Sequence, residues 1–207
     1  MLLALLTAGV TAAMAQNPFA DEPIDGTSST STNPNGRTGT GSTGLVFKYG
    51  NMHFKILSDK TVEVTGEVRS KYEGRVEIPN QVTHAGKTYK VVAIGEWAFQ
   101  NCSKMTSIVI PKSIQLIKSN AFFMDELTEV FIPGDNVKIK KSAFLSCQKL
   151  QVVTINGKTP RCSSKAFRLC TKMRELRIRG IDPSKNGKKL NTGSKDTPHY
   201  AVIKVIR

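Results

Sequence analysis

The spacing of hydrophobic residues predicts two β-hairpins in the region that begins near residue 45. Residues 52–57, MHFKIL, alternate apolar and polar side chains, which is the period-two pattern of a half-buried strand. A short polar turn separates them from residues 61–64, TVEV, which read as the partner strand. Residues 81–92 repeat the pattern around a turn at Gly86. A β-rich module is therefore expected to come first in the folded part of the chain.

After this module the pattern becomes a repeat, marked by an Ala-Phe pair. The pair falls at residues 98–99, 121–122, 143–144 and 166–167, so successive repeats are 23, 22 and 23 residues long. A constant period of this length is typical of leucine-rich repeats, in which one coil cannot bury its own apolar face and stacked coils complete the core.

Each repeat combines two local patterns. Apolar residues at i, i+4 and i+8 predict a short helix with one buried face, and an L-x-x-V-x-I spacing after it predicts a strand. The phenylalanines of the Ala-Phe pairs should then stack as an internal ladder. We expect an α/β solenoid: a short leucine-rich repeat array of about four coils, with parallel strands on the concave side and short helices on the convex side, preceded by the β-hairpin module.

With Ile or Leu at the front of each coil and the Ala-Phe pair at the back, these coils closely resemble the BspA-like, or Treponema-type, leucine-rich repeat family of bacterial surface and secreted proteins. The resemblance covers residues 91–180, and the preceding IPNQV…GKTYKVVAIGEWAF segment is similar to the family's usual lead-in. Departures from the pattern are Asn156 and Arg179, which replace Pro at the ends of two strands, and Cys162, which replaces Ile.

The resemblance implies a non-enzymatic, secreted or cell-surface binding protein, adhesin-like, that recognises a protein or glycan ligand through the solenoid surface. The alternative is a structural or accessory subunit of a bacterial envelope assembly, in which the solenoid acts as a spacer.

The regions outside the repeats differ sharply in composition. The first fifteen residues are apolar and end in a small-x-small pattern, which is typical of a secretory signal although the usual positive n-region is missing; they are too short for a membrane span. The predicted organisation is a signal peptide (1–15), a disordered Ser/Thr/Gly-rich spacer (16–44), a β-hairpin N-terminal cap (45–90), leucine-rich repeats (91–180) and a basic C-terminal tail with a capping strand (181–207).

The four cysteines follow the phase of the repeat. Cys102, Cys147 and Cys170 occupy the same coil position and Cys162 an Ile position, so all four are expected to be small apolar core residues with free thiols. A disulfide between Cys147 and Cys170, one coil apart, is the alternative. The sequence has no C-x-x-C motif and no Cys/His cluster, so it predicts no metal site.

Catalytic motifs were not found. His53, His84 and His199 are isolated, and no nucleophile elbow, P-loop or zinc-protease motif accompanies them. His53 is expected on the polar face of its strand and His84 beside a turn, both in solvent. The sequence therefore predicts no enzyme, no catalytic or metal-binding residues and no cofactor.

The charge of the chain is strongly basic and unevenly distributed. Lys and Arg number 30 against 16 Asp and Glu, a formal net charge of +14, and the excess lies between Lys138 and Lys189. Either an anionic partner or a solvated basic face accounts for it. Nucleic acid is not expected as a partner, because aromatic residues are not interleaved with the basic ones and export removes the chain from cytoplasmic DNA.

The candidate ligand-binding residues are those that alternate with the buried positions of the strands and so point outward. Phe131 in this set would form an exposed apolar patch with an arginine nearby, the composition of an interaction hot spot. The alternatives are that the spacer or tail covers the patch, or that binding occurs on the basic convex side around Lys165, Arg168 and Lys172. The sequence does not specify the ligand or the oligomeric state. The predicted concave-face residues are Ser107, Val109, Glu129, Phe131, Val152, Thr154, Glu175, Arg177 and Arg179.

Overall fold

The computed structural model describes residues 44–66, 72–157, 161–163, 165–179, 190–191 and 200–206. All of them belong to one compact unit, residues 38–207. The predicted signal peptide, nearly all of the predicted spacer, His199 and most of the predicted tail lie outside the described residues.

Both predicted hairpins are present. The first consists of the antiparallel strands β1 (Val46–Tyr49), β2 (Met52–Ile56) and β3 (Thr61–Thr65), and the second of β5 (Gln81–His84) and β6 (Lys87–Ile94). The turn of the second hairpin has two left-handed residues, Ala85 (φ 49°) and Gly86 (φ 73°), as a tight two-residue turn requires. Strand β3 pairs with β6 in parallel and joins the two hairpins into one sheet.

The same sheet continues into the repeats through three short strands. These are β8 (Leu116–Ile117), β10 (Lys138–Ile139) and β12 (Arg161–Cys162), and the order is β1-β2-β3-β6-β8-β10-β12 with β5 beside β6. Strands β6, β8, β10 and β12 are parallel. The hairpin module and the repeats therefore share hydrogen bonds instead of meeting only through side chains.

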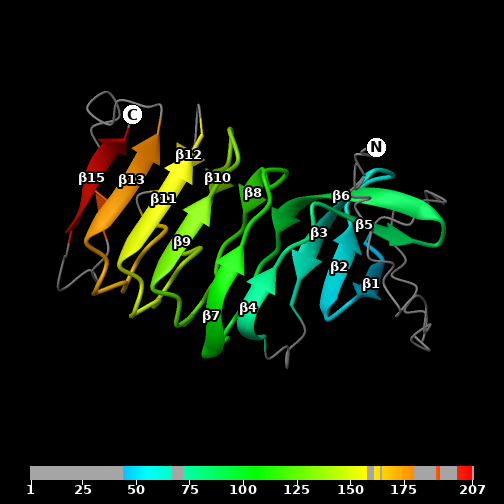
Figure 1. Ribbon diagram of the computed structural model, residues 1–207, viewed down its shortest axis with the longest axis horizontal. Coiled ribbons are helices and arrows are strands. Elements are labelled where there is room, and N and C mark those ends of the chain that lie inside the picture. The colour runs from blue at the N-terminus through cyan, green and yellow to red at the C-terminus, as the bar shows by residue number, and fades with distance from the viewer. Residues whose placement is uncertain are drawn as a thin grey trace, which may run out of the picture. The chain divides into compact units, whose positions relative to one another are not determined.

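The longer strands of the repeats form two further sheets (Figure 1). Strand β4 (Glu73–Glu77) pairs in parallel with β7 (Lys104–Val109), so a strand from the N-terminal module pairs with the first repeat. The other sheet has the order β14-β15-β13-β11-β9, formed by β9 (Glu129–Ile132), β11 (Val152–Asn156), β13 (Glu175–Arg179), β14 (Leu190–Asn191) and β15 (Tyr200–Ile206). Strand β15 is parallel to β13, so a strand from the predicted tail pairs with the last repeat.

The predicted short helices are wrong: the described residues contain no helix. Residues 96–101, 119–124, 141–146 and 165–169 are turns instead. Many of their amides bond to the next turn, as in Phe99 N to Ala121 O (2.8 Å) and Phe122 N to Ala143 O (2.9 Å), and the bonds within a turn span three residues, as in Gln100 N to Trp97 O (3.2 Å). An α-helix needs these amides for its own i−4 carbonyls. The four turns form a hydrogen-bonded ladder, which we call the turn row.

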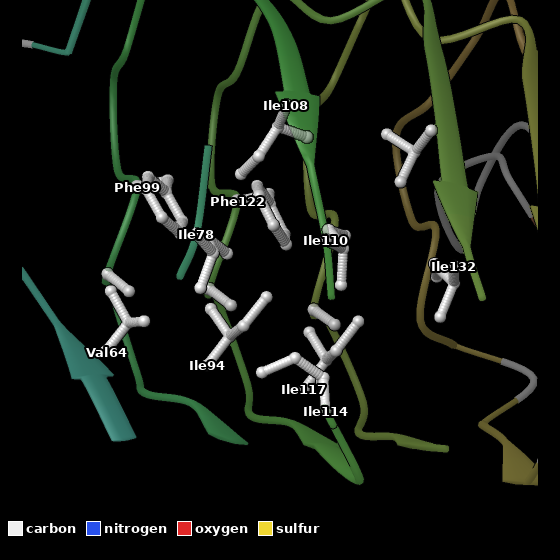
Figure 2. Packing of buried hydrophobic residues seen from close by; sticks show 14 of the residues in the cluster. Val64, Ile78, Ile94, Phe99, Ile108, Ile110, Ile114, Ile117, Phe122 and Ile132 are labelled. Atoms are coloured by element: carbon white, nitrogen blue, oxygen red, sulfur yellow. The ribbon is translucent and has the colours of Figure 1, made fainter. Parts of the chain in front are cut away.

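The predicted phenylalanine ladder is confirmed. Phe99, Phe122, Phe144 and Phe167 are fully buried, and their rings stack with centroid separations of 5.3, 4.7 and 5.0 Å. Figure 2 shows Phe99 and Phe122 beside the isoleucines of the neighbouring strands. Each turn contributes one ring and each strand two or three aliphatic side chains, so the core is continuous from repeat to repeat.

One histidine prediction is wrong. His53 is only 8% exposed, although the alternation of β2 places it on the polar face. That face is covered in the middle of the sheet, since Glu63 on the adjacent strand β3 is also buried, with its carboxylate 2.6 Å from the Lys118 ammonium. His84 is partly exposed and stacks on Phe47 at a centroid distance of 4.3 Å.

Candidate functional site

Six of the predicted ligand-binding residues lie in two rows across strands β9, β11 and β13. In register, Phe131, Thr154 and Arg177 form one row and Glu129, Val152 and Glu175 the other. We call these two rows the sheet face. Neighbouring strands are about 4.8 Å apart, so the Phe131 and Arg177 backbones are separated by about 10 Å.

The two end members of the first row are accessible and chemically different. Phe131 is 51% exposed, although both its neighbours in the strand are buried. Arg177 is half-buried, and its Nε donates to Glu175 Oε2 at 2.8 Å. This pair lies on one strand, and Arg177 is in register with Thr154, which is also half-buried. The row can therefore offer an aromatic ring, a hydroxyl and a cation within one contact area.

Two parts of the predicted site need correction. Val152 is only 3% exposed, because this short side chain lies on a central strand between the longer Glu129 and Glu175 in its row. Ser107 and Val109 lie on β7, which pairs with β4 in a separate sheet, so they do not share the hydrogen-bonded register of the sheet face.

Arg179 is the ninth residue of the predicted site. It ends β13 in register with Asn156, one row beyond Arg177.

The turn row carries a second accessible surface. Trp97 is 43% and Met124 48% exposed, and the Trp97 and Phe123 rings meet edge to face at 5.4 Å. Sequence reasoning missed this apolar cluster. The available signal was the repeat alignment, in which Trp97 corresponds to Asn120 and Ser142, and Met124 to Asn101 and Ser146. The predicted basic residues Lys165, Arg168 and Lys172 are at least partly exposed at the other end of the array.

A buried carboxyl group was also missed. Asp125 is fully buried and occupies the repeat position held by Cys102, Cys147 and Cys170 in the other repeats. Its Oδ1 accepts a hydrogen bond from Glu126 N at 2.8 Å. Burial, followed by the nearby Glu126 carboxylate, raises the pKa of Asp125 to about 8 despite the backbone donors. Asp125 is thus neutral between its ordinary pKa of 3.8 and about 8, a range in which carboxylates are normally charged.

The cysteines at this position use their thiols as donors to the backbone. Cys147 Sγ lies 2.8 Å from Phe122 O, and Cys170 Sγ lies 2.9 Å from Phe144 O. All four cysteines are free thiols, as predicted. Burial raises the pKa of Cys102 to about 11, of Cys162 to about 12 and of Cys147 well above the usual value. Because the thiolate is the reactive form, these groups are chemically quiet at neutral pH.

A shallow polar cavity of about 210 Å³ lies between the loops that follow the longer strands. Its polar lining is Lys112, Gln115, Asp135, Asn136 and Asn156. The loops approach closely there, since a Cβ added at Gly157 would lie 2.5 Å from Gly134 O. Sequence reasoning did not identify this cavity.

The described residues contain neither a metal-binding group of side chains nor a membrane-spanning helix. No group of three or more His, Cys, Asp or Glu side chains in this part of the chain is placed to hold a metal ion. Among the same residues, no helix has the length and apolar character needed to cross a membrane.

The stacked turns and parallel strands define a leucine-rich repeat protein. Residues 75–184 match the family described as BspA type Leucine rich repeat region, in 6 copies. Because this match spans more than half of the 207 residues, the chain belongs to that family, as the sequence resemblance predicted.

The solved structure of one bacterial antigen shares this fold. The pneumococcal vaccine antigen PcpA is 20% identical, with 68% of this chain and 46% of that chain covered and a TM-score of 0.51. A leucine-rich repeat protein from Bacteroides ovatus is 22% identical (64% and 49% covered, TM-score 0.33), and one from Bacteroides capillosus is 20% identical (78% and 99% covered, TM-score 0.40).

The chain spans about half the length of PcpA and of the B. ovatus protein. At this identity the likeness to PcpA shows the fold alone. No curated protein matches the chain significantly.

Proposed function

We propose that this chain is a non-enzymatic binding protein, secreted or held at the cell surface, that acts in an adhesin-like way through the sheet face. Its ligand is a protein or a glycan. The observation that carries the proposal is the row of Phe131, Thr154 and Arg177 in hydrogen-bonded register, with Phe131 51% exposed.

The side chains of this row are more typical of a ligand-binding surface than of a surface that contacts only water. A solvated outer face of a sheet normally carries polar side chains, and a large aromatic ring there exposes apolar surface to water. Aromatic and arginine side chains dominate binding energy at protein interfaces, and aromatic faces also stack on sugar rings. The Glu175 carboxylate holds Arg177 in place, so less side-chain freedom is lost when a ligand binds.

We also infer that the described repeats form a short solenoid of about four coils. The support is the Ala-Phe period of 22 or 23 residues, the hydrogen bonds from each turn to the next, and ring separations of about 5 Å. The division into cap (45–90) and repeats (91–180) remains a prediction, and β6 crosses its boundary. Export remains a prediction based on residues 1–15 and on the family.

Two pull-downs with the purified full chain test the proposal and its alternative. One uses solubilised host extracellular-matrix proteins and the other the solubilised envelope of the producing bacterium. Specific capture from the matrix sample, lost when Phe131→Ser and Arg177→Glu are combined, supports an adhesin-like protein. Capture only of envelope components would favour the structural or accessory subunit instead.

A matched control keeps this test specific. Met124→Ser with Lys165→Glu also removes one exposed apolar side chain and reverses one positive charge, but on the turn row. The control should capture the same matrix components as the wild type. Equal loss in both double variants would indicate a general charge effect and would contradict a site on the sheet face.

A further inference from the structure

The turn row presents an apolar cluster that is partly exposed to solvent. Trp97 and Met124 are about half exposed, and Phe123, half-buried, meets Trp97 edge to face and precedes Met124 on the same turn. Asn101 N donates to Phe123 O at 2.9 Å and Met124 N to Leu145 O at 2.9 Å, so the backbone under the cluster is fixed. The three side chains therefore project from a rigid edge rather than from an independent loop.

Backbone conformation makes this cluster costly. Trp97 has φ 60° and Met124 φ 55°, both in the left-handed region that bulky residues rarely adopt. At the same repeat positions Asn101, Asn120, Ser142, Ser146 and Leu169 adopt left-handed values of 56–61°, and Asn tolerates that region well. Trp and Met thus occupy positions where Asn would fold more easily, and they also expose apolar surface. Strain of this kind concentrates at functional positions.

Further along the same turn row the side chains become cationic. Lys165 takes the repeat position of Trp97, Arg168 that of Phe123, and Lys141 lies on the turn between the apolar and cationic ends. Ser142 N donates to Lys165 O and Ser146 N to Arg168 O, so these turns belong to the same ladder. One edge of the protein therefore carries an apolar end and a basic end, with turns about 5 Å apart.

The size of the apolar cluster argues against a stable protein partner. An aromatic side chain buries about 150–250 Å² when fully covered, so three partly exposed side chains offer roughly 300 Å². A stable protein interface buries about 800 Å² per partner. Binding at a membrane surface needs much less, because a few inserted apolar side chains act together with cations that attract anionic lipids.

We propose that the turn row docks on an anionic membrane surface, with Trp97, Phe123 and Met124 entering the headgroup region and Lys141, Lys165 and Arg168 contacting the lipid phosphates. This surface is separate from the sheet face and goes beyond the proposed function. Trp and other aromatic residues favour this interfacial depth, and basic side chains favour anionic headgroups.

Vesicle binding followed by tryptophan emission tests the proposal directly. Trp97 is the single tryptophan of the chain, so its fluorescence reports the cluster alone. The full chain is mixed with vesicles of phosphatidylcholine, or of phosphatidylcholine and phosphatidylglycerol. We expect a blue shift, and quenching by brominated lipid, with the anionic vesicles, and a much weaker response to pure phosphatidylcholine. Unchanged emission with both vesicle types would overturn the proposal.

Variants then separate the apolar and electrostatic parts. Met124→Asn should weaken sedimentation with anionic vesicles at least tenfold, about 1.4 kcal/mol, while the fold is retained because Asn suits the left-handed backbone. Lys165→Glu with Arg168→Glu should abolish the preference for phosphatidylglycerol. Because residues 1–15 are apolar in every variant, only differences from the wild type count.

A control and an alternative occupant complete the test. Phe131→Ser removes an equally exposed apolar side chain from the sheet face and should leave vesicle binding unchanged. If Phe131→Ser weakens vesicle binding as much as Met124→Asn, the docking surface is misplaced and the proposal fails. If sedimentation velocity shows a dimer that Met124→Asn abolishes, the occupant is a second copy and the membrane proposal is wrong.

Discussion

Replacing Asp125 by Asn should change how stability depends on pH. Asp125 is fully buried, and its pKa in the folded protein is raised from 3.8 to about 8. In the unfolded chain the carboxyl ionises near its ordinary pKa. Folding therefore favours the protonated form, so this group stabilises the protein fully below about pH 4. That stabilisation is lost as the pH rises towards 8.

The loss of stability between pH 4 and pH 8 follows from the rise in the pKa of Asp125. Each pKa unit corresponds to about 1.4 kcal/mol, so a rise of this size amounts to about 5 kcal/mol between pH 4 and pH 8. Asn has the same shape and no charge, and its amide can donate a hydrogen bond as the buried Cys147 and Cys170 thiols do. The variant should therefore be less pH-dependent than the wild type over this range and more stable near pH 8.

Urea unfolding of both proteins at pH 4.5, about 6.5 and about 8.5 measures this difference; the lowest value lies just above the ordinary carboxyl pKa. All other titrating groups are common to both proteins and cancel in the comparison. The neighbouring Cys102 and Cys147 thiols stay neutral throughout, because burial raises their pKa values. If the free energy of unfolding changed equally with pH in wild type and Asp125→Asn, the argument would be refuted. Asp125 would then have the same pKa in the folded and the unfolded chain.

Three further outcomes test the packing. Phe122→Ala should destabilise the fold by about 3–5 kcal/mol, because Phe122 stacks on Phe99 and Phe144; a loss below about 1 kcal/mol in chemical denaturation, typical of surface changes, would refute the repeat alignment. Thiol titration of the unreduced, denatured protein should find four free sulfhydryls, and two or none would show an oxidised pair. Gly157→Ala should cost about 1–3 kcal/mol, since its Cβ would meet Gly134 O at 2.5 Å; unchanged thermal stability would mean that these loops pack differently.

Features with a strong sequence period were predictable. The Ala-Phe period aligned Phe99 with Phe122 and placed both in one ladder, and the alternation around Gly86 predicted the second hairpin. The helices were wrong for an understandable reason. Apolar residues at i and i+4 point inward from a tight turn as well as from a helix, and only hydrogen bonds between repeats distinguish the two.

For the candidate site, the face on which the side chains lie was predictable, but the exposure of each side chain was not. Alternation placed Phe131 and Arg177 on one face, and they lie in the same row. It could not show that Val152 is covered, because that depends on the lengths of neighbouring side chains. Nor could it show the strained turns at Trp97 and Met124, since bulky residues normally argue against left-handed backbone.

The most direct test of the account is quantitative capture by the sheet face. Wild type and the Phe131→Ser, Arg177→Glu double variant are titrated over immobilised extracellular-matrix proteins, with circular dichroism confirming that both are folded. The account predicts at least tenfold weaker capture by the variant, about 1.4 kcal/mol, whereas Met124→Ser with Lys165→Glu binds like the wild type. Unchanged capture by a correctly folded double variant would contradict the claim that Phe131 and Arg177 form the binding site.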